Sequence, residues 1–113
     1  MQEVAEAENR LQGTNVAQGP DFLVHNEGDD VAVAVSDIEP GPAQVRYMDS
    51  GREAGVEVTE PIPLGHKVAL VNLAPESEVR EYGVRVAITR TAIPRGSLAH
   101  VHNLRSARWE ASR

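Results

Sequence analysis

One short pattern occurs three times in this chain and limits the folds that it can form. In each copy a strand-like run leads to an isoleucine or leucine, and a proline follows one or two residues later. The copies are residues 34–41 (AVSDIEPG), 69–76 (ALVNLAPE) and 89–96 (TRTAIPRG). Proline cannot continue a central strand, so each copy predicts a strand that ends in a tight turn. Strand-and-turn chemistry could produce one copy by chance, but three copies favour a compact barrel-like fold with many sharp corners.

Alternating hydrophobic residues predict strands between these turns. The alternation is clearest in residues 55–60, where Val56 and Val58 would face inward while Glu57 and Thr59 face outward. The other predicted strands are 21–25, 31–35, 44–48 (the weakest), 66–71, 84–89 and 97–103. No window has convincing helical periodicity, and valine-rich runs separated by Gly and Pro favour strands. We therefore predict an all-β domain.

The length and the composition limit the classes of protein that this chain can belong to. A chain of 113 residues is expected to form one domain, with residues 1–20 as a flexible N-terminal tail and residues 21–113 as the folded part. There is no cysteine, which excludes disulfides, thiolate metal sites and a cysteine nucleophile. The N-terminus lacks the basic and apolar regions of a secretory signal, and no apolar run is long enough to span a bilayer. We expect a cytoplasmic protein with no membrane partner.

Charge is distributed unevenly along the chain. Residues 1–60 contain 13 acidic and 3 basic residues, a net charge of −10, and residues 61–113 contain 4 acidic and 8 basic residues, a net charge of +4, which together give −6. The acidic total argues against nucleic-acid binding. The basic part includes Arg90, Arg95, Arg105 and Arg108. These arginines could face an anionic ligand or an acidic partner, or could simply be solvated.

Three histidines stand in patterns that are typical of a functional site. His100 and His102 are two residues apart in the segment AHVHNL, so on a strand both rings would lie on one face, about 7 Å apart. Two imidazoles can share a metal at that spacing, but other ligands would have to complete the site. His66 follows Gly65, whose conformational freedom could let the chain aim His66 and Lys67 from a rim. Solvated polar residues are the alternative interpretation of both motifs.

Other polar residues are predicted to have structural roles. Asp29 and Asp30 are neighbours, and neighbours on a strand face opposite ways, so we interpret them as a turn rather than as a catalytic carboxylate pair. His25 ends an apolar run and is interpreted as a strand-end residue with an ordinary hydrogen bond. Asn103 is expected to cap a turn.

Taken together, several motifs resemble a known family. The segments are IPLGHKVAL (62–70), EYG (81–83), AIPRG (92–96) and HVHNL (100–104). They are similar to the SAF-type β-clip domain of the altronate/galactarate dehydratase family of sugar-acid lyases. Residues 21–38 and 102–109 most resemble the free-standing small subunits of sulfolactate sulfo-lyases and altronate dehydratases, so the resemblance covers about residues 21–109. Leu98 occupies a position that is often histidine in the family, a difference that concerns the choice of substrate.

This resemblance implies a β-clip fold and a reaction. The reaction is α,β-elimination of water or sulfite from a hydroxy acid such as altronate or sulfolactate, by a small subunit that is active only with a large catalytic partner subunit. A divalent metal, commonly iron(II), would be held mainly by that partner. The residues implied for this chain are His66 and Lys67 as catalytic groups, His100 and His102 as metal ligands, and Asn103 and Arg105 as substrate-binding groups.

A non-catalytic function is the alternative that the sequence leaves open. SAF domains also occur in pilus-assembly and flagellar proteins, where they bind carbohydrate or a protein partner without catalysis. The missing secretory signal counts against that function, since those proteins work outside the cytoplasm. Trp109, the single tryptophan, would either close the core or anchor a partner. In isolation the chain could also form a homo-oligomer.

Overall fold

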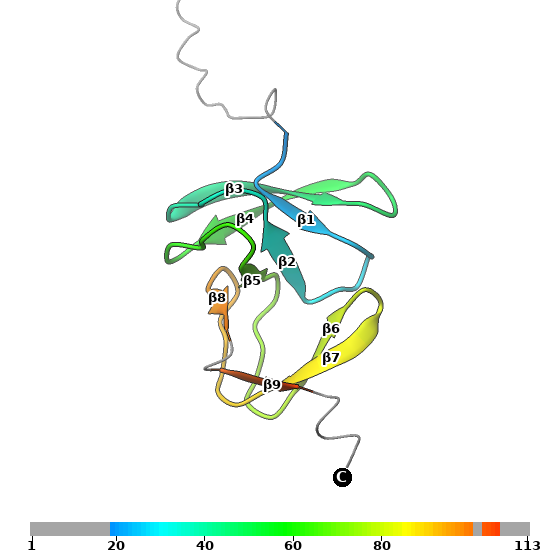
Figure 1. Ribbon diagram of the computed structural model, residues 1–113, viewed down its shortest axis with the longest axis vertical. Coiled ribbons are helices and arrows are strands. Elements are labelled where there is room, and N and C mark those ends of the chain that lie inside the picture. The colour runs from blue at the N-terminus through cyan, green and yellow to red at the C-terminus, as the bar shows by residue number, and fades with distance from the viewer. Residues whose placement is uncertain (1–18, 101–102, 107–113) are drawn as a thin grey trace, which may run out of the picture.

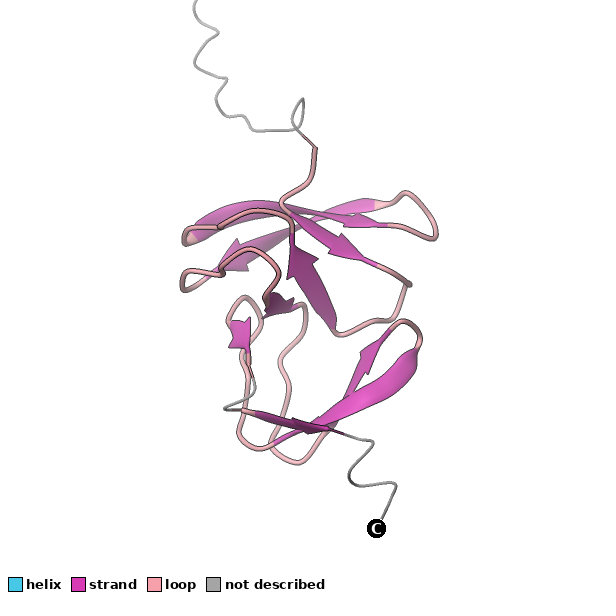
Figure 2. Ribbon diagram, viewed as in Figure 1, coloured by secondary structure: helices cyan, strands magenta, loops and turns pink. Residues whose placement is uncertain are grey.

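The computed structural model describes residues 19–100 and 103–106, which form two β-sheets (Figure 1). Within these ranges every regular element is a strand, so the predicted all-β class is confirmed (Figure 2). The strands are β1 (Phe22–Val24), β2 (Val31–Ala34), β3 (Gly41–Tyr47), β4 (Glu53–Val58), β5 (Lys67–Ala69), β6 (Glu78–Glu81), β7 (Val84–Thr89), β8 (Leu98–Ala99) and β9 (Leu104–Ser106). The described residues contain no helix with the length and apolar character needed to cross a membrane.

The larger sheet has six strands in the order β4-β3-β1-β2-β5-β8. β1 pairs in parallel with β3, while its pairing with β2 and the other pairings of this sheet are antiparallel. β3 and β4 form a long hairpin, in which Val56 and Val58 are buried while Glu57 is exposed, as the alternation predicts. At the other end of the sheet, β5 and β8 carry or adjoin His66, Lys67 and His100.

The smaller sheet has three strands in the order β6-β7-β9 and lies beside the β5 and β8 end of the larger sheet (Figure 1). A two-residue turn joins β6 to β7, and its residues Tyr82 and Gly83 have φ angles of 60° and 76°. Positive φ at both central positions is the geometry of a type I′ hairpin turn. For a tyrosine this left-handed conformation costs about 1–2 kcal/mol, so other contacts must hold the turn.

Four buried isoleucine or leucine residues lie at the corners of the fold, one more than the repeat predicts, and we call them plug residues. Ile38 pairs with Ile62 in one isolated bridge, and Leu73 pairs with Ile93 in another. The three predicted copies contain Ile38, Leu73 and Ile93, whereas Ile62 belongs to a fourth unit. Three residues after each plug the backbone has positive φ, at Gly41, Gly65, Glu76 and Gly96.

The hydrogen bonds around the two bridges show that the repeat is structural. Asp37, just before the plug Ile38, accepts a hydrogen bond on Oδ1 from the backbone N–H of Leu64 (2.9 Å). Asn72, just before the plug Leu73, accepts one on Oδ1 from the N–H of Arg95 (2.8 Å). Leu64 and Arg95 each lie two residues after the partner plug, so the same polar contact closes both corners.

The buried apolar side chains form two clusters that share two strands. The first contains Phe22, Val24, Ala32, Ala34, Ile38, Ala43, Val45, Tyr47, Val56, Val58, Ile62 and Val68. The second contains Val31, Ala69, Leu73, Val79, Ala87, Ile93 and Ala99. β2 gives Ala32 to the first cluster and Val31 to the second, and β5 does the same with Val68 and Ala69. Each fully buried Val, Ile or Phe contributes about 1.5–3 kcal/mol relative to an exposed one.

The structure corrects the predicted strand at residues 97–103. β8 contains only Leu98 and Ala99, and the chain turns immediately afterwards, because the N–H of Asn103 donates to the carbonyl oxygen of His100 (2.9 Å). His100 therefore lies just beyond the end of β8, and His102, the other histidine of the expected strand face, lies outside the described residues. β6 and β9 are strands that the sequence analysis missed, and the weakly predicted strand at 44–48 belongs to β3, which is seven residues long.

Candidate functional site

His66 and His100 lie side by side across the β5–β8 pair. Lys67 pairs with Ala99 in the ladder, so one step further the antiparallel register places His66 opposite His100. Their ring centroids are 5.8 Å apart and the ring planes differ by 4°, so the rings are stacked in parallel with an offset. His66 is exposed and His100 is half-buried. The structure thus brings together two of the histidines that the sequence singled out, while His102 lies outside the described residues.

Asn103 fixes the backbone around His100. Its Oδ1 accepts a hydrogen bond from the N–H of His100 (2.7 Å), and its Nδ2 donates to the carbonyl oxygen of Leu98 (3.1 Å). The prediction that Asn103 caps a turn is therefore confirmed. Together with Glu60, these three residues line an open depression of about 310 Å³. Glu60 is held there because its carboxylate accepts the N–H of Leu98 (2.9 Å).

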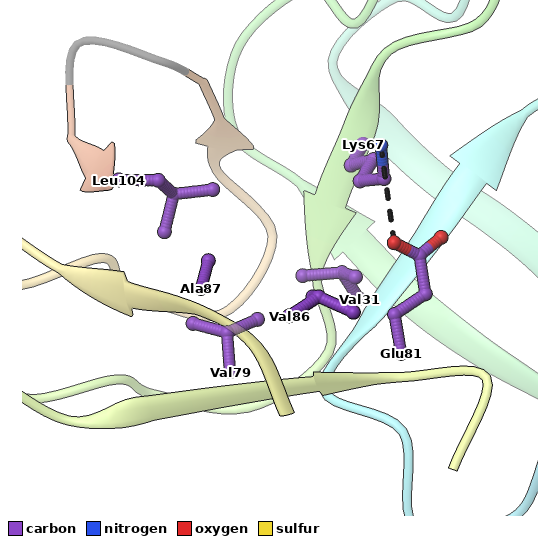
Figure 3. Close-up of a pocket in the computed structure, with 7 residues that line it drawn as sticks. All are labelled: Val31, Lys67, Val79, Glu81, Val86, Ala87 and Leu104. Atoms are coloured by element: carbon purple, nitrogen blue, oxygen red, sulfur yellow. Dashed lines mark ion pairs between the residues drawn. The ribbon is translucent and has the colours of Figure 1, made fainter. Parts of the chain in front are cut away.

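Lys67 points away from the histidine pair. Sequence neighbours in a strand face opposite sides, so His66 turns to one face of β5 and Lys67 to the other. Lys67 lies at one end of a half-enclosed cavity of about 210 Å³ (Figure 3). The cavity is lined by Val31, Lys67, Val79, Glu81, Val86, Ala87 and Leu104. The structure therefore separates the two catalytic candidates, which the sequence analysis expected to share a rim.

Glu81 is a residue of this cavity that the sequence analysis did not single out. It is 5% exposed, and its Oε1 lies 3.9 Å from the Nζ of Lys67. Burial raises the pKa of Glu81, while the positive charge of Lys67 opposes that rise. Its signal in the sequence is its place in the EYG segment, one of the motifs that carry the family resemblance.

Asp29 is also buried and its carboxylate holds the β6–β7 turn. It accepts hydrogen bonds from the N–H groups of Tyr82 and Gly83 (both 2.9 Å) and of Asn26 (3.2 Å). The interpretation of Asp29 as a structural turn residue agrees with these contacts. His25 directly follows β1 and its carbonyl oxygen accepts the N–H of Asp49 (3.1 Å), which agrees with its interpretation as a strand-end residue, and its ring also contacts that of Tyr82, with 4.2 Å between centroids.

The arginines of the basic part are engaged within the chain where the structure describes them. Arg105, on β9, forms an ion pair with Glu76 (2.7 Å), and Arg90 donates from Nε to the carbonyl oxygen of Leu104 (2.9 Å). Arg95 donates to the carbonyl oxygens of Leu70 and Gly55 (both 3.0 Å). These contacts stabilise the fold, and a substrate-binding function of Arg105 stays a prediction. Arg108 and Trp109 lie outside the described residues.

The described residues could supply only part of the ligands of a metal site. They contain no group of three or more His, Cys, Asp or Glu side chains that could hold a metal ion. The pair of His66 and His100 could supply at most two nitrogen ligands, and zinc or iron sites in proteins use three or more protein ligands. Any metal at this pair therefore needs ligands from another chain or from residues outside the described ranges.

Comparison with known proteins identifies relatives along almost the whole described chain. Residues 20–107 match the family model of the altronate/galactarate dehydratase SAF domain. The chain is 37% identical over 91 residues to the (2R)-sulfolactate sulfo-lyase subunit alpha of Chromohalobacter salexigens, an alignment that covers 79% of this chain and 97% of that protein. It is 39% identical over 76 residues to the galactarate dehydratase (L-threo-forming) of Escherichia coli, and 29% identical over 85 residues to the altronate dehydratase of Bacillus subtilis.

The coverage of these relatives differs in an informative way. The alignment spans nearly all of the sulfo-lyase subunit, but only 13% of the galactarate dehydratase and 16% of the altronate dehydratase. A domain of this kind therefore occurs both as a separate small chain and as a small part of a longer enzyme. The resemblance noted from the sequence motifs is confirmed, and this chain belongs to the altronate/galactarate dehydratase SAF domain family.

Proposed function

We propose that this chain is the small subunit of a metal-dependent lyase that eliminates water or sulfite from a hydroxy acid, and that it needs a large partner subunit for activity. The observation that carries this proposal is coverage: the chain aligns with 97% of a protein that is itself named as one subunit of a sulfo-lyase. The two dehydratases are several times longer than the segment that this chain matches, which leaves room for most of the catalytic body elsewhere.

The histidine pair suggests what this subunit contributes. An elimination of this kind removes the proton next to a carboxylate and expels hydroxide or sulfite from the neighbouring carbon, with formation of a carbon–carbon double bond. His66 is exposed, and its Nδ1 lies 3.4 Å from the carbonyl oxygen of Leu64. That contact favours a proton on Nδ1 and leaves Nε2 to accept the substrate proton. Asn103 holds the backbone of His100, so the second ring stands in a defined place beside His66.

The proposal also assigns roles to a metal and to the other candidate residues of this chain. A divalent metal, proposed to be iron(II) held mainly by the partner, supplies charge neutralisation at the substrate carboxylate when bound. His100 and His102 would be the ligands that this chain adds to such a site. Lys67 would act from the other face of β5, through the cavity that it shares with Glu81. Asn103 and Arg105 are proposed to contact substrate or to position the groups that do.

Reconstitution with the partner subunit tests this function. The purified chain, a large subunit from the same organism that co-purifies with it, and their complex are assayed with iron(II) against altronate, galactarate and sulfolactate. We expect turnover only by the complex, and His66→Ala should lower its kcat by about 100-fold or more if His66 transfers a proton. Arg46→Ala is the control, because Arg46 lies on β3, far along the sheet order from β5. Robust turnover by the isolated chain would contradict the subunit proposal, and binding of an acid without turnover by the complex would favour the binding module.

A further inference from the structure

Lys67 is the only lysine of the chain, which otherwise uses arginine at its ten remaining basic positions. Arginine stays charged in proteins, whereas a lysine at an apolar site can change its charge and is commonly used for proton transfer. The four-carbon stem of Lys67 lies against a cavity with an apolar wall that includes Val31, Val79 and Leu104. The ammonium of Lys67 is therefore placed at the boundary between an apolar wall and solvent.

Glu81 is the acidic group that faces Lys67 across this cavity (Figure 3). Its side chain is 6% exposed, and that of Lys67 is 37% exposed. A buried carboxylate is costly unless it is paired, and the ion pair that the structure gives Glu81 is with Lys67. At 3.9 Å the pair is longer than the ion pairs of Arg46, Arg52 and Arg105, which are 2.7–2.8 Å. The longer separation leaves the ammonium hydrogens able to reach a ligand in the cavity.

The backbone that carries Glu81 is fixed from the other sheet. Glu81 is the last residue of β6, directly before the turn at Tyr82 and Gly83. Asp29, in the β1–β2 connection, accepts the N–H groups of both turn residues with its buried carboxylate. These charge-assisted hydrogen bonds offset the backbone strain of Tyr82. They also fix the backbone position of Glu81 without the need for a bound ligand.

We infer from this arrangement that Glu81 is a positioning residue, which holds the Lys67 ammonium at the polar end of the cavity and orients it for the reaction. The inference rests on the proposed function, which gives Lys67 a catalytic role. Without Glu81 the long side chain of Lys67 would sample several rotamers and point into solvent, because the rest of the cavity wall is apolar.

The charges around Glu81 support this role. Burial raises its pKa, Lys67 and His25 lower it, and Asp29 raises it further. The net pKa is above the ordinary value of 4.5, so Glu81 exchanges its proton closer to neutral pH than a solvated glutamate does. A protonated Glu81 holds Lys67 less strongly, so the orientation of the lysine should depend on pH in that range.

The single lysine allows a direct test on the full chain. Reductive methylation with ¹³C-formaldehyde labels Lys67 and the α-amino group, and NMR relaxation of the methyl signals then measures how ordered the Lys67 head group is without other lysine signals. Glu81→Gln should make the Lys67 head group more mobile, because the opposite charge that holds the ammonium is lost. Glu81→Asp keeps the charge and should retain part of the order. The matched control is Glu53→Gln, which removes the carboxylate of the surface ion pair with Arg46.

The same variants are then measured in the complex with the partner. We expect Glu81→Gln to lower kcat by about 10-fold with KM little changed and to flatten the acid side of the pH profile, and Glu81→Asp to recover part of the loss. Unchanged mobility of the Lys67 head group in folded Glu81→Gln, or an unchanged kcat and pH profile, would overturn the inference. If the unmodified complex has no lyase activity, the proposed function fails, while the NMR measurement still decides whether Glu81 controls Lys67. Glu81→Asp serves for both measurements if Glu81→Gln does not fold.

Discussion

The buried carboxylate of Glu81 gives the chain a specific dependence of stability on pH. Because its folded-state pKa is raised above 4.5, the folded chain binds a proton at Glu81 more tightly than the unfolded chain does. The stabilisation from this difference is fully present below pH 4.5 and is lost as the pH rises through the folded-state pKa. The free energy of unfolding of the unmodified chain, minus that of Glu81→Gln, should therefore decrease from pH 4.5 towards pH 7.

Urea unfolding at several pH values measures this difference. Glu53→Gln is again the suitable comparison, since both side chains of its ion pair are 41% exposed and solvent screens them. A difference that stays constant between pH 4.5 and 7 would mean that Glu81 is not desolvated in the folded chain.

At the scale of single residues, only part of the candidate site could be predicted from the sequence. The sequence identified His66 and His100, and the structure stacks their rings. It did not separate Lys67 from His66, although the rule that strand neighbours face opposite sides requires it. Glu81 could not be found by pattern, because its burial depends on Lys67 and on the turn that Asp29 holds, which are 14 and 52 residues away in sequence.

At the scale of elements, alternation predicted the strands whose apolar residues face a core, and missed those without a clear pattern. β6 (Glu78–Glu81) has a single valine, and β9 (Leu104–Ser106) is three residues long, so both depend on pairing with β7. β8 was overestimated because the alternation continues in the sequence to His102, whereas the side chain of Asn103 bonds to the backbone of Leu98 and His100. The competing hydrogen bond of an asparagine side chain has no signature in hydrophobicity.

Gly96 shows how closely these elements approach one another. It follows the plug Ile93 by three residues, has a φ of 89°, and its carbonyl oxygen accepts the N–H of Thr59 (2.9 Å). A Cβ at this position would collide with the carbonyl oxygen of Glu57 at the end of β4. Gly96→Ala should therefore lower the free energy of unfolding by about 3 kcal/mol or more, or prevent folding, since backbone strain and a backbone clash add.

Gly51→Ala separates those two contributions. Gly51 has a φ of 77° in the β3–β4 hairpin, but no atom lies within 4 Å of a Cβ built there. It should cost only about 1 kcal/mol, the strain of a left-handed alanine. Thermal and urea unfolding of both variants measures the two costs, and equal costs would contradict the close approach of residue 96 to β4.

At the scale of the whole molecule, the two apolar clusters should unfold together. Val31 and Ala32 are adjacent in β2 but belong to different clusters, and the same is true of Val68 and Ala69 in β5. Each of these two central strands supplies buried residues to both clusters. Loss of packing in one cluster therefore releases strands that the other cluster also needs, so neither can unfold alone. Small single domains with such shared elements generally unfold in one cooperative transition.

Two core substitutions, one in each cluster, test this coupling. Ile93→Ala removes a buried side chain from the second cluster and Val58→Ala one from the first, and each should lower the free energy of unfolding, by about 2–5 kcal/mol for Ile93 and somewhat less for Val58. In both variants, far-UV circular dichroism and the NMR signal of methylated Lys67 should report the same urea midpoint with an unchanged m-value. Lys67 lies on β5, between the clusters, so its signal follows whichever side opens first. If Ile93→Ala lowered the midpoint of the Lys67 signal while the midpoint from circular dichroism stayed that of the unmodified chain, the smaller sheet would be an independent folding unit. In that case the cavity between Lys67 and Glu81 could open without loss of the larger sheet, because Glu81 belongs to the smaller sheet and Lys67 to the larger one.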